Sequence, residues 1–367
     1  MFFATGFSII ITIWVLNFNR FIFTCMALMI FYYGLQLNFL NYFKSYSQDK
    51  ISYAFWLYYL CLIGFSVVGF FITKKYTFTL PDKPIKASGR HVSFLLSLFA
   101  IVLFFSIIDV RQLFTFTRPG LVNFGYFLSM FLYVTIFLSY SHKHLILMSI
   151  QLVLLLFLSK LMVGSFVLYY LAVNLKISPK YYLLFLIALI FVFLSWGVFQ
   201  DNLNSISDSN INRFVELNFF FTYVVEGGKS LVTQQEFETF PDFGVSALRS
   251  FILRIIPGFL LRELNISLVP RGITDSIVIS GIESMMIHYN LLAPLFFTLY
   301  LAILLYLFNR SGLTTKFFAF SIMIFFVRSG LISALNNLAV LLIIYLLFFL
   351  LVRLLDCFGR NKISTLA

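Results

Sequence analysis

The stretch from Phe317 to Val352 reads FFAFSIMIFFVRSGLISALNNLAVLLIIYLLFFLLV and contains a single charged residue, Arg328. A helix needs about 20 mainly apolar residues to cross the hydrocarbon core of a bilayer. This stretch is long enough for two such helices, and we place them at Phe317–Leu335 and Leu338–Val352. The segment therefore predicts a helical membrane protein.

The composition of the whole chain favours the same class. Of its 367 residues, 61% are hydrophobic and 11% are charged, and the mean hydropathy is +0.98. Soluble domains carry about 25% charged residues, so this chain has too few to cover a water-exposed surface. A cytosolic enzyme, a nucleic-acid-binding protein and a disordered tail are excluded. The predicted fold class is all-α, a polytopic transmembrane protein.

Nine further apolar segments are candidates for crossing helices, which makes about eleven in total. The first is expected to be a retained helix, because it lacks the basic region and cleavage site of a signal peptide. The nine segments are Phe2–Phe18, Phe21–Phe43, Tyr53–Thr73, Val92–Ile108, Leu121–Tyr140, Leu145–Ser159, Leu161–Leu175, Tyr181–Phe199 and Ile287–Phe308.

The stretch Leu145–Leu175 is interrupted only by Lys160, so it forms either one long helix or two short ones. The positive-inside rule decides between these alternatives. If Leu145–Leu175 crosses twice, the basic residues of Lys74–Arg90 lie on the cytoplasmic side. If it crosses once as a long helix, they lie outside. We therefore predict two short or re-entrant segments, with the N-terminus outside and the C-terminus inside.

One long polar interval separates the apolar segments. Residues 200–286 hold ten of the fourteen acidic residues. The chain is thus expected to have three parts, namely transmembrane helices over 1–199, a large helical outer loop over 200–286, and helices with a cytoplasmic tail over 287–367. Because long loops are usually functional, the active site is expected in this loop.

The second half of the loop is rich in arginine. Its four basic residues are all arginine, and between the first and the last of them the only acid is Glu263. A guanidinium group is always charged and presents a fork that matches phosphate oxygens, so this cluster favours anion recognition. The four residues are Arg249, Arg254, Arg262 and Arg271.

A second interpretation applies to the first two of these arginines. Apolar residues recur at helical spacing over Val245–Ile256, which predicts an amphipathic helix ended by Pro257. Arg249 and Arg254 flank its apolar stripe. Such arginines often extend from an interfacial helix towards lipid headgroups, and for any single arginine both interpretations stay open.

Two cations fall inside or beside predicted membrane helices. A charge at the bilayer centre costs about 2.5–3.5 kcal/mol on insertion scales, so it normally faces a polar cavity or extends to the interface. For Arg328, followed by Ser329 and Ser333, we expect a water-filled outer vestibule; a structural partner is the alternative. Lys160 is equally consistent with a turn.

Glu283 and His288 lie where the loop enters the ninth predicted helix. Either side chain can act as a general base near neutral pH when its environment is tuned. The alternative is a pair of polar residues at the membrane boundary. The motifs of nucleotide-binding loops, zinc proteases and serine hydrolases are absent from the sequence, and the three cysteines have no metal-ligand spacing, so neither a metal nor a cofactor is predicted.

Three motifs occur in the second half of the chain, namely Ser246–Ser250 leading to Pro257, Gly281–Glu283 leading to His288–Pro294, and Arg328–Gly330 followed by Ser333–Asn336. They resemble those of the Wzy-type O-antigen or oligosaccharide repeat-unit polymerases of the bacterial inner membrane. The chain departs from the family pattern at Asn290, where a glycine is frequent, and at Phe166, where an arginine often stands.

This resemblance implies a GT-C-like, metal-independent glycosyltransferase that works on the periplasmic face. Its substrates would be undecaprenyl-diphosphate-linked oligosaccharides in the lipid bilayer, and its partner a polysaccharide chain-length regulator; nucleic acid is not expected. Glu283 or His288 would deprotonate the attacking hydroxyl. The diphosphates would be bound by Arg249, Arg254, Arg262, Arg271, Arg328 and Lys160.

Two related activities remain as alternatives. An O-antigen ligase of the same broad fold relies on a histidine in the outer loop, and His288 is the only candidate there. A flippase for lipid-linked oligosaccharides would line a central cavity with charges and would not need a long outer loop.

Overall fold

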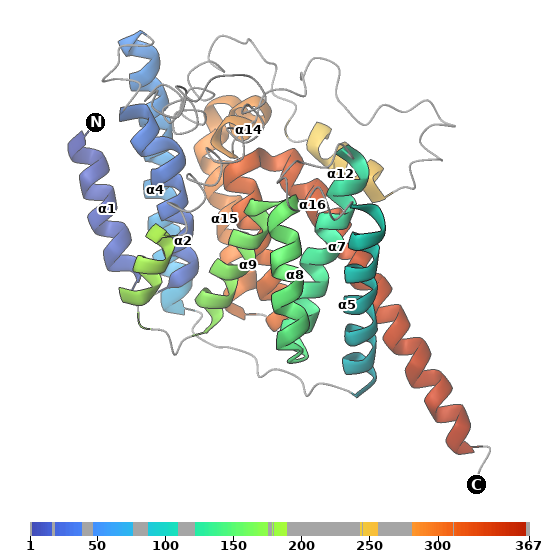
Figure 1. Cartoon of the computed structure of the whole chain (residues 1–367). Helices are drawn as coiled ribbons and strands as arrows, with labels where there is room; N and C mark the ends of the chain where they lie inside the picture. Colours follow the sequence, from blue (N-terminus) through green and yellow to red (C-terminus); the bar gives the residue numbers. More distant parts are fainter. Residues whose placement is uncertain are drawn as a thin grey trace, which may run out of the picture. The chain divides into compact units, whose positions relative to one another are not determined.

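The computed structural model describes residues 2–16, 19–38, 47–75, 87–108, 122–174, 178, 180–188, 243, 245–255, 281–310 and 312–364 (Figure 1). Every regular element within these ranges is a helix. The labelled elements are α1 (Phe2–Leu16), α2 (Arg20–Met29), the π-helix η1 (Ile30–Leu35), α4 (Gln48–Lys75), α5 (Ala87–Ile107), α7 (Val122–Ser141), α8 (Leu145–Leu158), α9 (Lys160–Val173), α12 (Val245–Ile255), α14 (Gly281–Tyr289), the 3₁₀ helix η4 (Asn290–Leu292), α15 (Ala293–Arg310) and α16 (Leu313–Ser364), and residues 180–188 are also helical.

Five helical segments are long and apolar enough to cross a membrane. They are Arg20–Asn38, Gln48–Lys74, Gly89–Ile107, Gly281–Arg310 and Leu313–Cys357. For the described part of the chain, this confirms the prediction of an all-helical membrane protein. The count of about eleven crossings and the GT-C-like architecture stay predictions.

The chain divides into two compact units. Unit 1 comprises residues 1–80, 168–190 and 211–337, and unit 2 comprises residues 81–167, 191–210 and 338–367. The division into 1–199, 200–286 and 287–367 was predicted from hydropathy and describes which parts of the chain lie in the membrane. It also stays a prediction.

Unit 2 contains a polar network between α5, α7 and α8. The Ser97 and Ser139 hydroxyls lie 2.7 Å apart, and Ser139 donates to the Gln151 amide oxygen at 3.1 Å. The Gln151 amide nitrogen donates to the Thr135 hydroxyl at 2.9 Å. All four side chains are fully buried. Interhelical hydrogen bonds of this kind stabilise apolar helix pairs, which gain little from hydrophobic burial in lipid.

The stretch around Lys160 forms two helices, as predicted. Ser159 adopts an extended conformation (φ −153°, ψ 101°) between α8 and α9. Each of these helices has 14 residues. At a rise of 1.5 Å per residue, each is about 21 Å long, which is shorter than the hydrocarbon core of a bilayer. Lys160 begins α9, and its side chain lies outside the described part.

Unit 1 is built around α4 and α15, which pack closely at Gly64. A Cβ atom on Gly64 would lie 2.7 Å from the Thr298 hydroxyl oxygen, so glycine permits this approach. The core between α2, α15 and α16 is aromatic, because the Phe21 ring lies 5.0 Å from that of Phe308 and 5.9 Å from that of Phe320.

Arg20 stabilises another helix end in unit 1. Its Nη1 atom donates to the carbonyl oxygens of Leu171 at 2.6 Å and Asn174 at 2.7 Å, at the C-terminal end of α9. A cation is favourable at this position because the last carbonyls of a helix are unpaired and carry partial negative charge. Arg20 therefore has a structural role.

Candidate functional site

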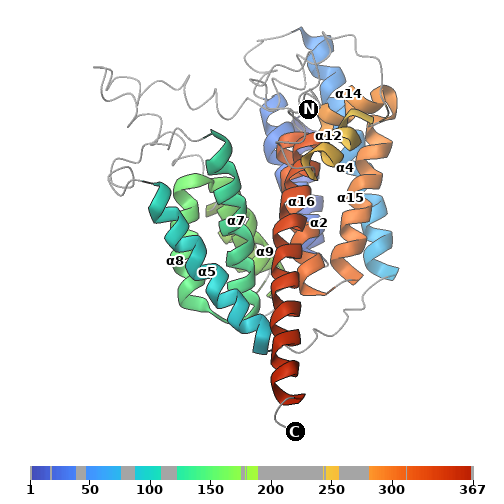
Figure 2. The ribbon, with the colours of Figure 1, turned by 90° about the vertical axis from the view of Figure 1, so that its right-hand side faces the viewer.

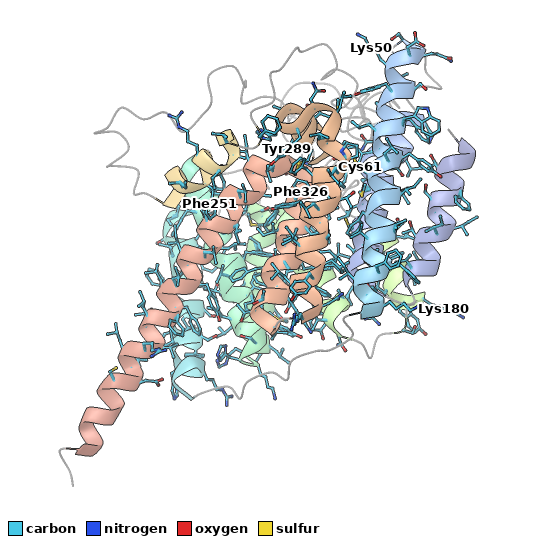
Figure 3. All side chains as sticks on the ribbon, turned by 180° about the vertical axis from the view of Figure 1, so that it is seen from behind. Lys50, Cys61, Lys180, Phe251, Tyr289 and Phe326 are labelled. Atoms are coloured by element: carbon cyan, nitrogen blue, oxygen red, sulfur yellow. The ribbon has the colours of Figure 1, made fainter. Side chains whose placement is uncertain are left out.

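The two motifs at 281–294 and 328–337 meet in unit 1. Helix α14 lies at one end of α15, as Figures 1 and 2 both show. Figure 3 places Lys50 and Lys180 at opposite ends of the unit, with Tyr289 of α14 nearer the Lys50 end. With the predicted spans and the N-terminus outside, Lys50 is expected outside the membrane and Lys180 on the cytoplasmic side, so α14 lies at the end that is expected to face outward.

Gly281 allows the first turn of α14 to approach α16 very closely. A Cβ atom at this position would lie 2.7 Å from the backbone oxygen of Phe326 and 3.2 Å from the Cα atom of Val327. Any larger residue would push the two backbones apart. The glycine of the Gly281–Glu283 motif is therefore required for packing.

Helix α14 begins six residues before the membrane helix predicted at Ile287–Phe308. It ends at Tyr289, and the next residue, Asn290, has a positive φ of 47°. Glycine and asparagine both tolerate this conformation better than most residues. The departure from the family pattern at Asn290 thus keeps the backbone geometry that a glycine would provide.

The two candidate general bases are both buried on α14. Glu283 and His288 are each 1% exposed, and Ser284 is buried between them. Glu283 lies in the first turn, where the helix dipole stabilises a negative charge. The His288 backbone oxygen accepts a hydrogen bond from the Phe243 amide at 3.0 Å, which links α14 to the residues just before α12.

Helix α16 is broken at Gly330. This residue has φ 77° and ψ 179°, a conformation that essentially only glycine adopts. The predicted separation of two helices at Asn336–Asn337 is wrong, because α16 continues through both asparagines. Asparagine lowers helix stability only modestly, so it does not end a helix that packing supports.

In a continuous helix the Val327 carbonyl and the Leu331 amide, which are four residues apart across Gly330, would pair with each other. Here the Tyr33 hydroxyl donates to the Val327 oxygen at 3.1 Å, and the Leu331 amide donates to the Ser284 hydroxyl at 3.0 Å. The Tyr33 oxygen also accepts from the Ile282 amide at 3.3 Å. Two side chains thus replace one helical hydrogen bond.

Arg328 lies in the turn before this break. It is half-buried, and its guanidinium carbon lies 5.5 Å from the centre of the Tyr32 ring. This cation–π contact gives Arg328 the structural partner that sequence analysis considered as the alternative. Tyr32 and Tyr33 both come from η1, and π-helical turns are frequent at functional sites.

Of the four loop arginines, Arg249 is the one whose side chain the structure describes. Helix α12 forms over nearly the predicted range, and Arg249 is exposed on it. Leu248 and Ile252 are 57% and 50% exposed, which favours the interfacial interpretation of α12. The side chain of Arg254 lies outside the described part, as do Arg262 and Arg271.

Tyr32, Tyr33 and Ser284 were not predicted from the sequence to belong to the site. The chain contains 20 tyrosines, so a tyrosine pair in an apolar segment carries no signal of its own. Among the described residues, no group of three His, Cys, Asp or Glu side chains is arranged to hold a metal ion. Comparison with known proteins finds no family model, no curated protein and no solved structure that matches this chain.

Proposed function

We propose that this chain is a membrane glycosyltransferase that polymerises undecaprenyl-diphosphate-linked oligosaccharide repeat units at the periplasmic face of the bacterial inner membrane. One observation carries this proposal. The segments that resemble repeat-unit polymerases, 281–294 and 328–337, meet at the Ser284–Leu331 hydrogen bond, beside the close approach of Gly281 to Phe326 and Val327 on the same helix α16. They bring two buried proton acceptors and one cation into one compact unit.

The proposed chemistry is the displacement of a diphosphate by a sugar hydroxyl. Glu283 or His288 takes the proton of the hydroxyl at the non-reducing end of the incoming repeat unit. The oxygen attacks the anomeric carbon of the growing glycan, and the bond from that carbon to the diphosphate oxygen breaks. Negative charge develops on the leaving diphosphate, where Arg328 and the arginines of the outer loop stabilise it.

Deletion of the gene tests the activity through the banding pattern of the lipopolysaccharide. We expect molecules with one repeat unit on the lipid core, because units are still made, transferred across the membrane and ligated. A ligase defect instead leaves the core bare while polymer accumulates on the carrier. A flippase defect leaves single units on the carrier at the cytoplasmic face. Either of the last two patterns contradicts the proposal.

Replacing Arg328 by lysine tests the role of the guanidinium fork. The charge is kept but the second hydrogen bond to a diphosphate is lost, so polymer synthesis should fall about 10- to 100-fold. The measurement is the ladder produced by the variant in the deletion strain, at equal protein level. Arg310→Lys is the matched control, because Arg310 is exposed at the far end of α15 and donates to Tyr306. A wild-type ladder from Arg328→Lys would exclude a bidentate role.

A further inference from the structure

We infer that Tyr33 and Ser284 are positioning residues that hold α16 open at Gly330 and thereby set the place of Arg328. The inference rests on the proposed function only where it links Arg328 to diphosphate transfer. That the Tyr33 and Ser284 hydroxyls maintain the break follows from their hydrogen bonds alone.

Glycine permits the break without enforcing it. Gly330 can adopt helical angles as readily as the observed ones. A continuous α16 would recover the hydrogen bond between the Val327 carbonyl and the Leu331 amide. The broken form therefore needs other partners for both groups, because an unpaired backbone group inside a membrane protein is costly.

Both partners of these backbone groups come from outside α16. The Tyr33 hydroxyl is fully buried on η1 and donates to the Val327 oxygen, whereas the buried Ser284 hydroxyl on α14 accepts from the Leu331 amide. The Tyr33 oxygen also accepts from the Ile282 amide, so it joins η1, α14 and α16 at one atom. The three segments are thus held together at the break.

Arg328 lies two residues before Gly330 and faces Tyr32. Successive residues of a helix are rotated by about 100°, and a break in the helix changes the direction of the side chains beside it. Because Tyr32 and Tyr33 are neighbours on η1, the same element fixes the break and contacts the guanidinium. Loss of either hydroxyl should therefore displace Arg328 without removing it.

The first experiment measures the geometry independently of any activity. Ser329→Cys places a reporter thiol next to the break in a Cys357→Ser background, where the remaining cysteines, Cys25 and Cys61, are fully buried. The rate at which a water-soluble thiol reagent labels this cysteine is measured in three proteins: the reporter protein itself, the reporter protein with Tyr33→Phe and the reporter protein with Ser284→Ala. We expect each change to alter the labelling rate about threefold to tenfold, as loss of one hydrogen bond permits.

Two matched variants control for the simple loss of a buried hydroxyl in unit 1. Tyr169→Phe removes a hydroxyl that donates to the Leu313 oxygen at 3.1 Å, at the start of α16. Ser321→Ala removes a buried hydroxyl that donates to the Phe317 oxygen at 2.7 Å, inside the same helix. Both should leave the labelling rate unchanged. If Tyr33→Phe and Ser284→Ala behave like these controls, the inference is overturned.

The second experiment links the break to Arg328 through a double-mutant cycle. Tyr33→Phe should reduce polymer synthesis about tenfold in the wild-type background but cause little further loss beside Arg328→Lys, because residues that act through one group are not additive. Full additivity would mean that Tyr33 does not act through Arg328. If Tyr33→Phe and Ser284→Ala change the labelling rate but neither the wild-type protein nor any variant makes polymer, the geometric inference holds and the proposed function is wrong.

Discussion

Replacing Glu283 by glutamine is expected to reduce polymer synthesis about 100- to 10,000-fold, the range that a general base contributes. Glutamine keeps the size of the side chain, so the buried position on α14 stays filled. What is lost is the group that accepts the proton of the attacking hydroxyl. The measurement is the rate of polymer formation from lipid-linked repeat units by the purified protein, together with the ladder in the deletion strain.

His288→Ala and Asp49→Asn accompany this variant. Asp49 is an exposed carboxylate in the first turn of α4, so its replacement controls for the loss of one negative charge. If Glu283→Gln is inactive and His288→Ala retains activity, Glu283 is the base; the opposite result assigns the role to His288. Ladders of normal length from both variants would show that neither residue is essential.

The second large effect is expected from Gly281→Ala. The added Cβ atom would meet the Phe326 backbone oxygen at 2.7 Å, and a backbone atom cannot rotate away as a side chain can. Overpacking of this kind typically costs about 1–3 kcal/mol. The free energy of unfolding should fall, and α14 should shift together with Glu283. The thermal unfolding midpoint in detergent and the polymerisation rate both report this change.

Two other glycines provide graded controls for this variant. A Cβ atom on Gly64 would be too close to the Thr298 hydroxyl oxygen, a side-chain atom that can move by rotation, whereas two Thr298 carbon atoms lie at an ordinary 3.7 Å, so Gly64→Ala should be milder. A Cβ atom on Gly125 in α7 has no neighbour within 4 Å, and Gly125→Ala should leave the midpoint unchanged or slightly raised. Equal effects at all three positions would show that the α14–α16 contact is not specially close.

The helical membrane character could be predicted from Phe317–Val352 alone, because such a long apolar run has no other stable environment. The amphipathic helix over Val245–Ile255 follows from a local pattern, whereas the division at Lys160 follows from the distribution of basic residues along the chain. The break at Gly330 could not be predicted in the same way. It depends on hydroxyl groups of η1 and α14, which are far from α16 in the sequence.

The candidate site was predictable only in part. Glu283, His288 and Arg328 stand out because ionisable groups are rare in apolar segments, and the structure buries the first two and half-buries the third. The grouping of the loop arginines relied on their closeness in sequence, which does not fix where their side chains lie in space. Tyr33 and Ser284 matter through single hydrogen bonds, and no pattern marks those in advance.

The polar network in unit 2 fixes how far α5, α7 and α8 are shifted along one another. It is formed by Ser97, Thr135, Ser139 and Gln151. Apolar helices in lipid can slide along one another at little cost, because their surfaces are chemically uniform. A slip of one helical turn, about 5.4 Å, would separate the polar atoms that now lie within hydrogen-bond distance of each other. Gln151 can thus select a single axial alignment for three helices whose apolar surfaces alone would allow several.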